Sequence, residues 1–145
     1  TIDSIFLNMD NQRYMVVDDD STNNMICEFT IKRFDKEGNI KIFSVPEEAL
    51  SFIAQEYKLE NRKQPTILFL DINMPTMSGW EFLDEFLKFN EGVRNQFNIY
   101  MLSSSIEDFK EEAEIYSAIK GFISKPLKMN KLEEIKNGPL NSSTC

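Results

Sequence analysis

The stretch LFLDINMPTMSGW, residues 68 to 80, decides the fold. Its apolar run begins earlier, at Thr66, and stops at Asp71, after which Met74-Pro75 and Ser78-Gly79 supply turn-forming residues. A continuous apolar run bounded by turn residues is typical of a strand that is covered on both faces. A strand that is simply followed by a turn does not need a carboxylate at its end. The position of Asp71 therefore predicts a polar site at the edge of a sheet.

Short apolar runs of this kind alternate with helical patterns along the chain. The expected strands are residues 14–17, 40–43, 66–70, 98–102 and 121–124, and the expected helices are residues 21–34, 44–57, 79–89, 106–116 and 128–136. Ser21 is placed to cap the first helix, and Ser44 with Glu47 fits a capping box for the second. The alternation predicts a doubly wound α/β fold, in which a five-stranded parallel sheet carries helices on both faces.

Length and charge narrow the class of protein. A chain of 145 residues with 41% hydrophobic residues, 5 glycines and 5 prolines is typical of one globular domain. We expect an N-terminal extension over residues 1–12, the domain over 13–137 and a C-terminal tail over 138–145. The net charge of −8 argues against direct binding of nucleic acid, because neutralising phosphates requires a basic face.

The chain contains no histidine, which removes most zinc sites, Ser-His-Asp triads and Cys-His dyads. Its two cysteines, Cys27 and Cys145, make neither a disulfide framework nor a metal cluster. No apolar stretch approaches the roughly 20 residues of a membrane span. The first residues also lack the basic start of a signal peptide. We therefore expect a reducing, cytoplasmic setting and no membrane partner.

Candidate site residues follow four of the five expected strands, and the strand over residues 40–43 is followed only by Ser44. The candidates are Asp18 to Asp20, Asp71 with Asn73, Ser103 to Ser105, and Lys125 with Pro126. Ligands of an open parallel sheet bind beyond the carboxyl ends of its strands, so these residues are expected to converge. Three crowded carboxylates need a cation, either Mg²⁺, which takes oxygen ligands, or the ammonium of Lys125. With a hydroxyl donor at Ser103, the set suits a phosphoryl group that an aspartate accepts as an acyl phosphate.

Each of these pieces alone has a simpler explanation. Acidic residues after a strand often cap a helix, and Asp71 by itself could form a turn. Ser103 to Ser105 could cap the next helix, and Lys125-Pro126 could simply end a strand. Their shared location at one edge of the sheet is what favours a joint functional explanation.

Taken together, the motifs resemble the receiver domain of response regulators in two-component signalling, of the stand-alone, chemotaxis-regulator-like type. The matching stretches are MVVDDDS, FLDINMPTMSGWEFL, YMLSSS and GFISKPL, in this order over roughly residues 13 to 136. The resemblance implies a flavodoxin-like fold with strand order 2-1-3-4-5.

The resemblance also implies roles for the acidic residues and the lysine. Asp71 matches the phosphoacceptor aspartate. Asp18 and Asp19 match the acidic pair that binds Mg²⁺, with Asp71 and the main-chain carbonyl of Asn73 as further ligands. Lys125 matches the lysine that contacts a phosphoryl oxygen.

A second group of residues matches the family's switching elements. Ser103 matches the hydroxyl that moves to the phosphoryl group, and Phe122 matches the aromatic residue that turns inward in the active state. Pro126 stands where such domains often have a cis bond. Asn73 and Ser105 occupy the positions that tune dephosphorylation.

These roles imply protein partners rather than an enzymatic substrate. The phosphoryl group would come from a sensor histidine kinase or a histidine phosphotransfer protein, since this chain has no histidine of its own. Phosphorylation would change a surface formed by the fourth helix, fifth strand and fifth helix, which a downstream effector protein reads. Catalysis would be limited to the domain's own phosphorylation and dephosphorylation.

Two alternatives stay open at this point. MVVDDDST also fits the first motif of haloacid dehalogenase-type phosphohydrolases, with Asp18 as nucleophile and Asp20 as general acid. Against this interpretation, no aspartate follows Lys125 to supply that family's later metal-binding acids, and the stretch FLDINMP would have no explanation. The other alternative is a degenerate receiver that serves only as a protein-interaction module.

Overall fold

A computed structural model describes residues 11–58, 64–105 and 108–138. It contains a five-stranded parallel sheet with the order β2-β1-β3-β4-β5, which confirms the predicted fold and strand order. The elements are β1 (Arg13–Val17), α2 (Ser21–Phe34), β2 (Asn39–Phe43), α3 (Pro46–Glu56), β3 (Thr66–Asp71), α4 (Gly79–Phe86), α5 (Glu91–Arg94), β4 (Phe97–Ser103), α6 (Lys110–Ile115), β5 (Ile119–Ser124) and α7 (Met129–Asn137).

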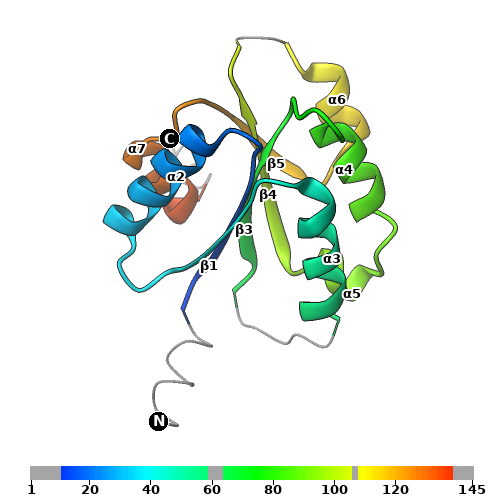
Figure 1. The fold of residues 1–145 in the computed structure, drawn as a ribbon, viewed down its shortest axis with the longest axis horizontal. Coiled ribbons are helices and arrows are strands. Elements are labelled where there is room, and N and C mark those ends of the chain that lie inside the picture. Colours follow the sequence, from blue (N-terminus) through cyan, green and yellow to red (C-terminus); the bar gives the residue numbers. More distant parts are fainter. Residues whose placement is uncertain (1–10, 59–63, 106–107, 139–145) are drawn as a thin grey trace, which may run out of the picture.

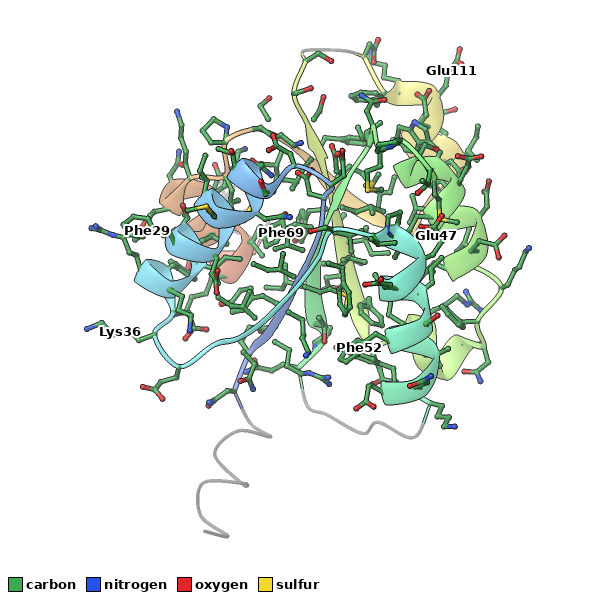
Figure 2. All side chains as sticks on the ribbon, viewed as in Figure 1. Phe29, Lys36, Glu47, Phe52, Phe69 and Glu111 are labelled. Carbon is green, nitrogen blue, oxygen red and sulfur yellow. The ribbon has the colours of Figure 1, made fainter. Side chains whose placement is uncertain are left out.

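The helices cover both faces of the sheet, with α2 and α7 on one side and α3, α4, α5 and α6 on the other (Figure 1). The central strand β3 shows why its apolar run is unbroken. Leu68 and Leu70 belong to the core on the α3–α4 side, whereas Phe69 belongs to the core under α2 and α7. Figure 2 shows Phe69 on the α2 side of the sheet. Because side chains alternate between the faces of a strand, both neighbouring cores demand apolar residues.

The register of the strands brings the polar residues of the sequence to one level. Val17 of β1 pairs with Leu70 of β3, so the aspartates that follow them, Asp18 and Asp71, stand side by side. On the other side of β3, Asp71 pairs with Leu102, the residue before Ser103. Lys125 lies at the same level, because Ser103 of β4 pairs with Ser124 of the edge strand β5, and Lys125 follows Ser124.

Two predicted helix starts are corrected by the structure. Helix α2 is capped by Asp20 rather than Ser21, and the Asp20 carboxylate accepts the main-chain N–H groups of Thr22 and Asn23. The capping box predicted for Ser44 and Glu47 is wrong. Helix α3 begins at Pro46, and its N-cap, Val45, has no side-chain cap hydrogen bond. Proline has a preset φ angle and no N–H group to satisfy, so it starts this helix without a polar cap.

Further elements also have boundaries that differ from the predicted ones. The helix predicted over 79–89 ends at Phe86, and the short helix α5, whose N-cap is Asn90, follows it. Strand β5 begins at Ile119, two residues earlier than predicted. The helix predicted over 106–116 is described only from 108 onward, and α6 covers Lys110–Ile115.

Gly79 fixes the distance between the end of β3 and the start of α4. A Cβ atom at this position would lie 2.5 Å from the main-chain oxygen of Asp71 and 2.9 Å from Cε of Met101. Gly79→Ala is therefore expected to lower the free energy of unfolding by about 1–3 kcal/mol, the usual cost of overpacking. Urea unfolding measures the change. Gly121→Ala is the matched control, because its Cβ would approach Tyr100 no closer than 3.4 Å. Equal stability of the two variants would contradict this prediction.

Candidate functional site

Asp18 lies at the end of β1, in the interior of the protein. Its main-chain N–H donates to the carbonyl of Phe43 across the sheet, at 3.0 Å. Its side chain has no exposed surface. Oδ1 accepts the main-chain N–H of Asp20 at 2.9 Å, and Oδ2 accepts the side-chain amide of Asn23 at 2.7 Å. The start of α2 therefore folds around this carboxylate and holds it from the helix side.

Lys125 joins this carboxylate to the one on β3. Its Nζ atom lies 2.9 Å from Oδ2 of Asp18 and 3.1 Å from Oδ1 of Asp71. The lysine follows β5 directly, and its main-chain N–H donates to the carbonyl of Ser103 at 2.8 Å. The Lys125-Pro126 peptide bond is cis, as predicted. Although burial lowers the pKa of Lys125, its hydrogen bonds with the two aspartates hold that pKa above its ordinary value.

Asp71 is 4% exposed, which makes its charge costly. Burial, followed by the charge of Asp18, raises the pKa of Asp71 to about 6, although Lys125 opposes the rise. One ammonium therefore does not fully compensate the two buried carboxylates. A further cation, or the loss of charge from Asp71 itself, would relieve the site.

The donor set fits a hard divalent cation. Asp18, Asp19 and Asp71 each offer one oxygen, and these atoms all lie within 4.8 Å of one another. The ammonium of Lys125 contacts two of these three carboxylates, those of Asp18 and Asp71, and carboxylate oxygens are ligands that Mg²⁺ takes. Asp19 is exposed and gives access from solvent, while the other two are buried. Asn73 is exposed on the loop after β3, and its predicted part as a ligand stays a prediction.

Ser103 is at the predicted edge, but its hydroxyl is held within its own loop. The side chain donates to the main-chain carbonyl of Ser105 at 2.6 Å and accepts the Ser105 N–H at 3.2 Å. These serines do not cap the next helix in the described residues, because the N-cap of α6 is Phe109 and has no side-chain cap hydrogen bond. The simpler explanation of this serine run is therefore removed. The predicted movement of Ser103 would exchange these local bonds for new ones.

Phe122 is half-buried on β5 and belongs to an aromatic cluster. Its ring stacks on Phe109 at a centroid distance of 5.1 Å and lies 6.4 Å from Trp80 of α4. Trp80 also stacks on Tyr116 at 5.6 Å. Phe109 and Tyr116 flank α6, which itself contributes no buried residue. A movement of Phe122 would therefore disturb the attachment of α6.

Two features of the site were missed at the level of sequence. The aromatic cluster unites Trp80 of α4 and Phe122 of β5 with Phe109 and Tyr116, which flank α6. Its signal in the sequence was the single tryptophan in an apolar helical stripe. Asn23 and Asn24 fall in the predicted helix of residues 21–34 without a predicted role, although both are buried. The signal available was their polarity on the face that also carries the core residue Cys27.

The sequence predicts no membrane partner. In the described part of the chain, no helix is both long and apolar enough to cross a bilayer.

Comparisons with known proteins agree with this geometry. The sequence profile described as "Response regulator receiver domain" matches residues 14–137. A two-component response regulator from Cytophaga hutchinsonii has a similar structure, with a TM-score of 0.77 and 27% identity over 90% of this chain and 98% of that one. A response regulator receiver protein from Dyadobacter fermentans has a TM-score of 0.73 and 22% identity, over 86% and 94% of the two chains. No curated protein sequence matches the chain.

Proposed function

Because this chain belongs to the response regulator receiver domain family, we propose that Asp71 accepts a phosphoryl group from a phosphorylated histidine. The donor would be a sensor histidine kinase or a histidine phosphotransfer protein. The observation that carries the proposal is the pairing of two buried carboxylates, Asp18 and Asp71, with the single ammonium of Lys125 at the carboxyl ends of the strands.

The proposed reaction uses groups already in place. A carboxylate oxygen of Asp71 forms a bond to phosphorus, the bond from phosphorus to the histidine nitrogen breaks, and the imidazole leaves. Lys125 already contacts Asp71, so its ammonium lies close enough to bind an oxygen of the phosphoryl group when that group reaches Asp71. Asp18, Asp19, Asp71 and the Asn73 carbonyl would hold Mg²⁺, which would supply positive charge that stabilises the phosphoryl oxygens.

The phosphoryl group is expected to be read through Ser103 and Phe122. The Ser103 hydroxyl would leave the Ser105 carbonyl for a phosphoryl oxygen, and Phe122 would shift within its aromatic cluster. The surface that changes comprises α6, β5 and α7. A hollow of about 620 Å³ lies there between β5 and α7, and Phe122 is part of its lining. A downstream effector protein would bind this surface.

The outer face of α2 offers a second surface for a protein partner. Met25 is 71% exposed and Phe29 is 63% exposed, and Figure 2 shows Phe29 on the outer side of this helix. Since α2 begins next to Asp18, a phosphoryl donor seated on it would stand close to the site. A cytoplasmic location and the tuning of dephosphorylation by Asn73 and Ser105 are further parts of this proposal.

The phosphohydrolase alternative fits the site less well. It needs Asp20 as a general acid, but the Asp20 carboxylate accepts two main-chain N–H groups as the cap of α2. It also needs Asp18 as the nucleophile, and both oxygens of Asp18 already accept hydrogen bonds.

Incubation with acetyl phosphate and Mg²⁺ is expected to add one phosphoryl group to the wild-type chain, as measured by intact-protein mass spectrometry. Asp71→Asn should abolish the adduct, because the amide is not a nucleophile, and removal of the metal by a chelator should prevent it. Asp84→Asn, a change at an exposed aspartate of α4, is the matched control and should keep the adduct.

An adduct that survives Asp71→Asn would point to Asp18 and restore the phosphohydrolase. If neither acetyl phosphate nor a phosphorylated histidine donor gives an adduct, the chain is an interaction module.

A further inference from the structure

The first turn of α2 carries two buried asparagines. Asn23 is 5% exposed and Asn24 is 6% exposed, on the side of the helix that also buries Cys27 and Ile31. Asparagine is a poor residue inside a helix, and a buried amide must find hydrogen-bond partners to offset its desolvation. An apolar residue would avoid both costs. The partners of these two amides therefore indicate what the asparagines contribute.

Asn23 contacts the carboxylate of Asp18 directly. Its Nδ2 atom donates to Oδ2 of Asp18 at 2.7 Å and to Sγ of Cys27 at 3.7 Å. An ionised carboxylate only accepts hydrogen bonds, so the nitrogen of the amide must face it. Both hydrogens of this amide are thus engaged, and the side chain has one orientation. A hydrogen bond of this length to a charged acceptor is of the strong, charge-assisted kind.

The donors are unevenly divided between the two oxygens of Asp18. Among the described residues, Oδ2 accepts from Asn23 and from Lys125, whereas Oδ1 accepts the main-chain N–H of Asp20 alone. Without Asn23, Oδ2 would depend on Lys125 alone, the same ammonium that reaches Asp71. Asn23 thus holds Asp18 independently of the lysine.

Asn24 is as buried as Asn23 and lies in the same helical turn, but it contacts the main chain of Asp18 rather than its side chain. Its Nδ2 atom donates to the main-chain carbonyl of Asp18 at 2.8 Å, not to the carboxylate. Its Oδ1 atom is buried without a hydrogen-bond partner among the described residues. Asn24 therefore supports the backbone at this corner and leaves the charged group to its neighbour.

We propose that Asn23 is a positioning residue, which holds the Asp18 carboxylate in place for a divalent cation. The inference rests on the proposed function, since it assigns Asn23 to the same site. Partners that hydrogen-bond to metal-ligating groups typically account for about 10–100-fold in metal affinity. Asn23→Leu, which keeps the volume and loses the donor, should weaken Mg²⁺ binding by about that factor.

The test is thermal unfolding over a series of Mg²⁺ concentrations, where the rise in Tm gives the affinity without any phosphorylation. Asn23→Leu is compared with Asn24→Leu, which removes an equally buried amide from the same turn. We expect the Mg²⁺ concentration for half of the effect to rise at least about tenfold in Asn23→Leu and to stay near the wild-type value in Asn24→Leu. Equal affinities in the two variants, whether both weakened or both unchanged, would overturn the proposal. If a leucine variant fails to fold, the alanine pair at the same positions takes its place.

Phosphorylation by acetyl phosphate separates this inference from the proposed function. In Asn23→Leu the half-saturating Mg²⁺ concentration should rise, while the rate at saturating Mg²⁺ stays close to that of the wild type, because Asp71 and Lys125 are unchanged. If the wild type forms its adduct on Asp71 and Asn23→Leu binds Mg²⁺ as tightly, this inference fails and the proposed function stands. A wild-type chain that neither binds Mg²⁺ nor forms an adduct overturns both.

Discussion

Lys125→Met lowers the free energy of unfolding by about 3 kcal/mol at neutral pH, as the structure leads us to expect. Methionine fills a similar volume but leaves Asp18, with no exposed surface, and Asp71, 4% exposed, without their shared ammonium. Removing one partner of a buried ion pair typically costs about 3–5 kcal/mol, because the other charge stays buried without compensation. The lower end of that range applies here, since Asp71 can escape part of the cost by taking up a proton.

Urea unfolding at neutral pH without added metal measures this loss. Lys131→Met is the matched control, because Lys131 pairs with Glu134 at 3.1 Å on an exposed turn of α7. Exposed pairs of this spacing contribute only about 0–1 kcal/mol. A loss in Lys125→Met no greater than that in Lys131→Met would show that the buried lysine does not carry the site.

Asp71→Asn should have the opposite effect and raise the stability of the protein at neutral pH. The pKa of Asp71 is raised from 3.8 to about 6, so the folded state binds its proton more tightly than the unfolded chain does. Stability from this group is therefore fully present below pH 3.8 and is lost as the pH rises through about 6. Above pH 7 the loss amounts to about 3 kcal/mol, which the neutral amide avoids.

The check is a series of urea unfolding curves between pH 4 and pH 8 in a chelator. The advantage of Asp71→Asn over the wild type should be small near pH 4 and grow up to about pH 7. Added Mg²⁺ should then narrow the gap, because it binds the folded wild type and stabilises it by mass action. A variant less stable than the wild type at pH 7.5 without metal would contradict the assigned cause of the raised pKa.

Much of the fold follows from the pattern of the sequence. Strand β3 was predictable because its side chains enter a core on each face, which requires an unbroken apolar run. The strand order was predicted through the family resemblance and is confirmed by the structure. The convergence of Asp18, Asp71 and Lys125 was also predictable, since parallel strands end at a common edge and the register places these residues at one level.

Other features depend on contacts that a linear pattern does not record. Ser44 and Glu47 have the spacing of a capping box, but Pro46 starts α3 instead, and the capping box of the structure lies at Ser78 and Glu81. The stacking of Phe109 on Phe122 joins residues from a loop and a strand, so no local period reveals it. The role of Asn23 depends on where its amide points, which only the fold decides.

The central claim is that Asp71 carries the phosphoryl group. After phosphorylation with acetyl phosphate and Mg²⁺, borohydride reduction converts an aspartyl phosphate to homoserine, and peptide mass spectrometry locates it. Trypsin separates the candidates, because Asp71 falls in the peptide of residues 64–88 and Asp18 in that of residues 14–32. We predict homoserine at position 71 only, and only when Mg²⁺ was present. Homoserine at position 18, or an unaltered aspartate at 71 in a phosphorylated sample, would contradict the account.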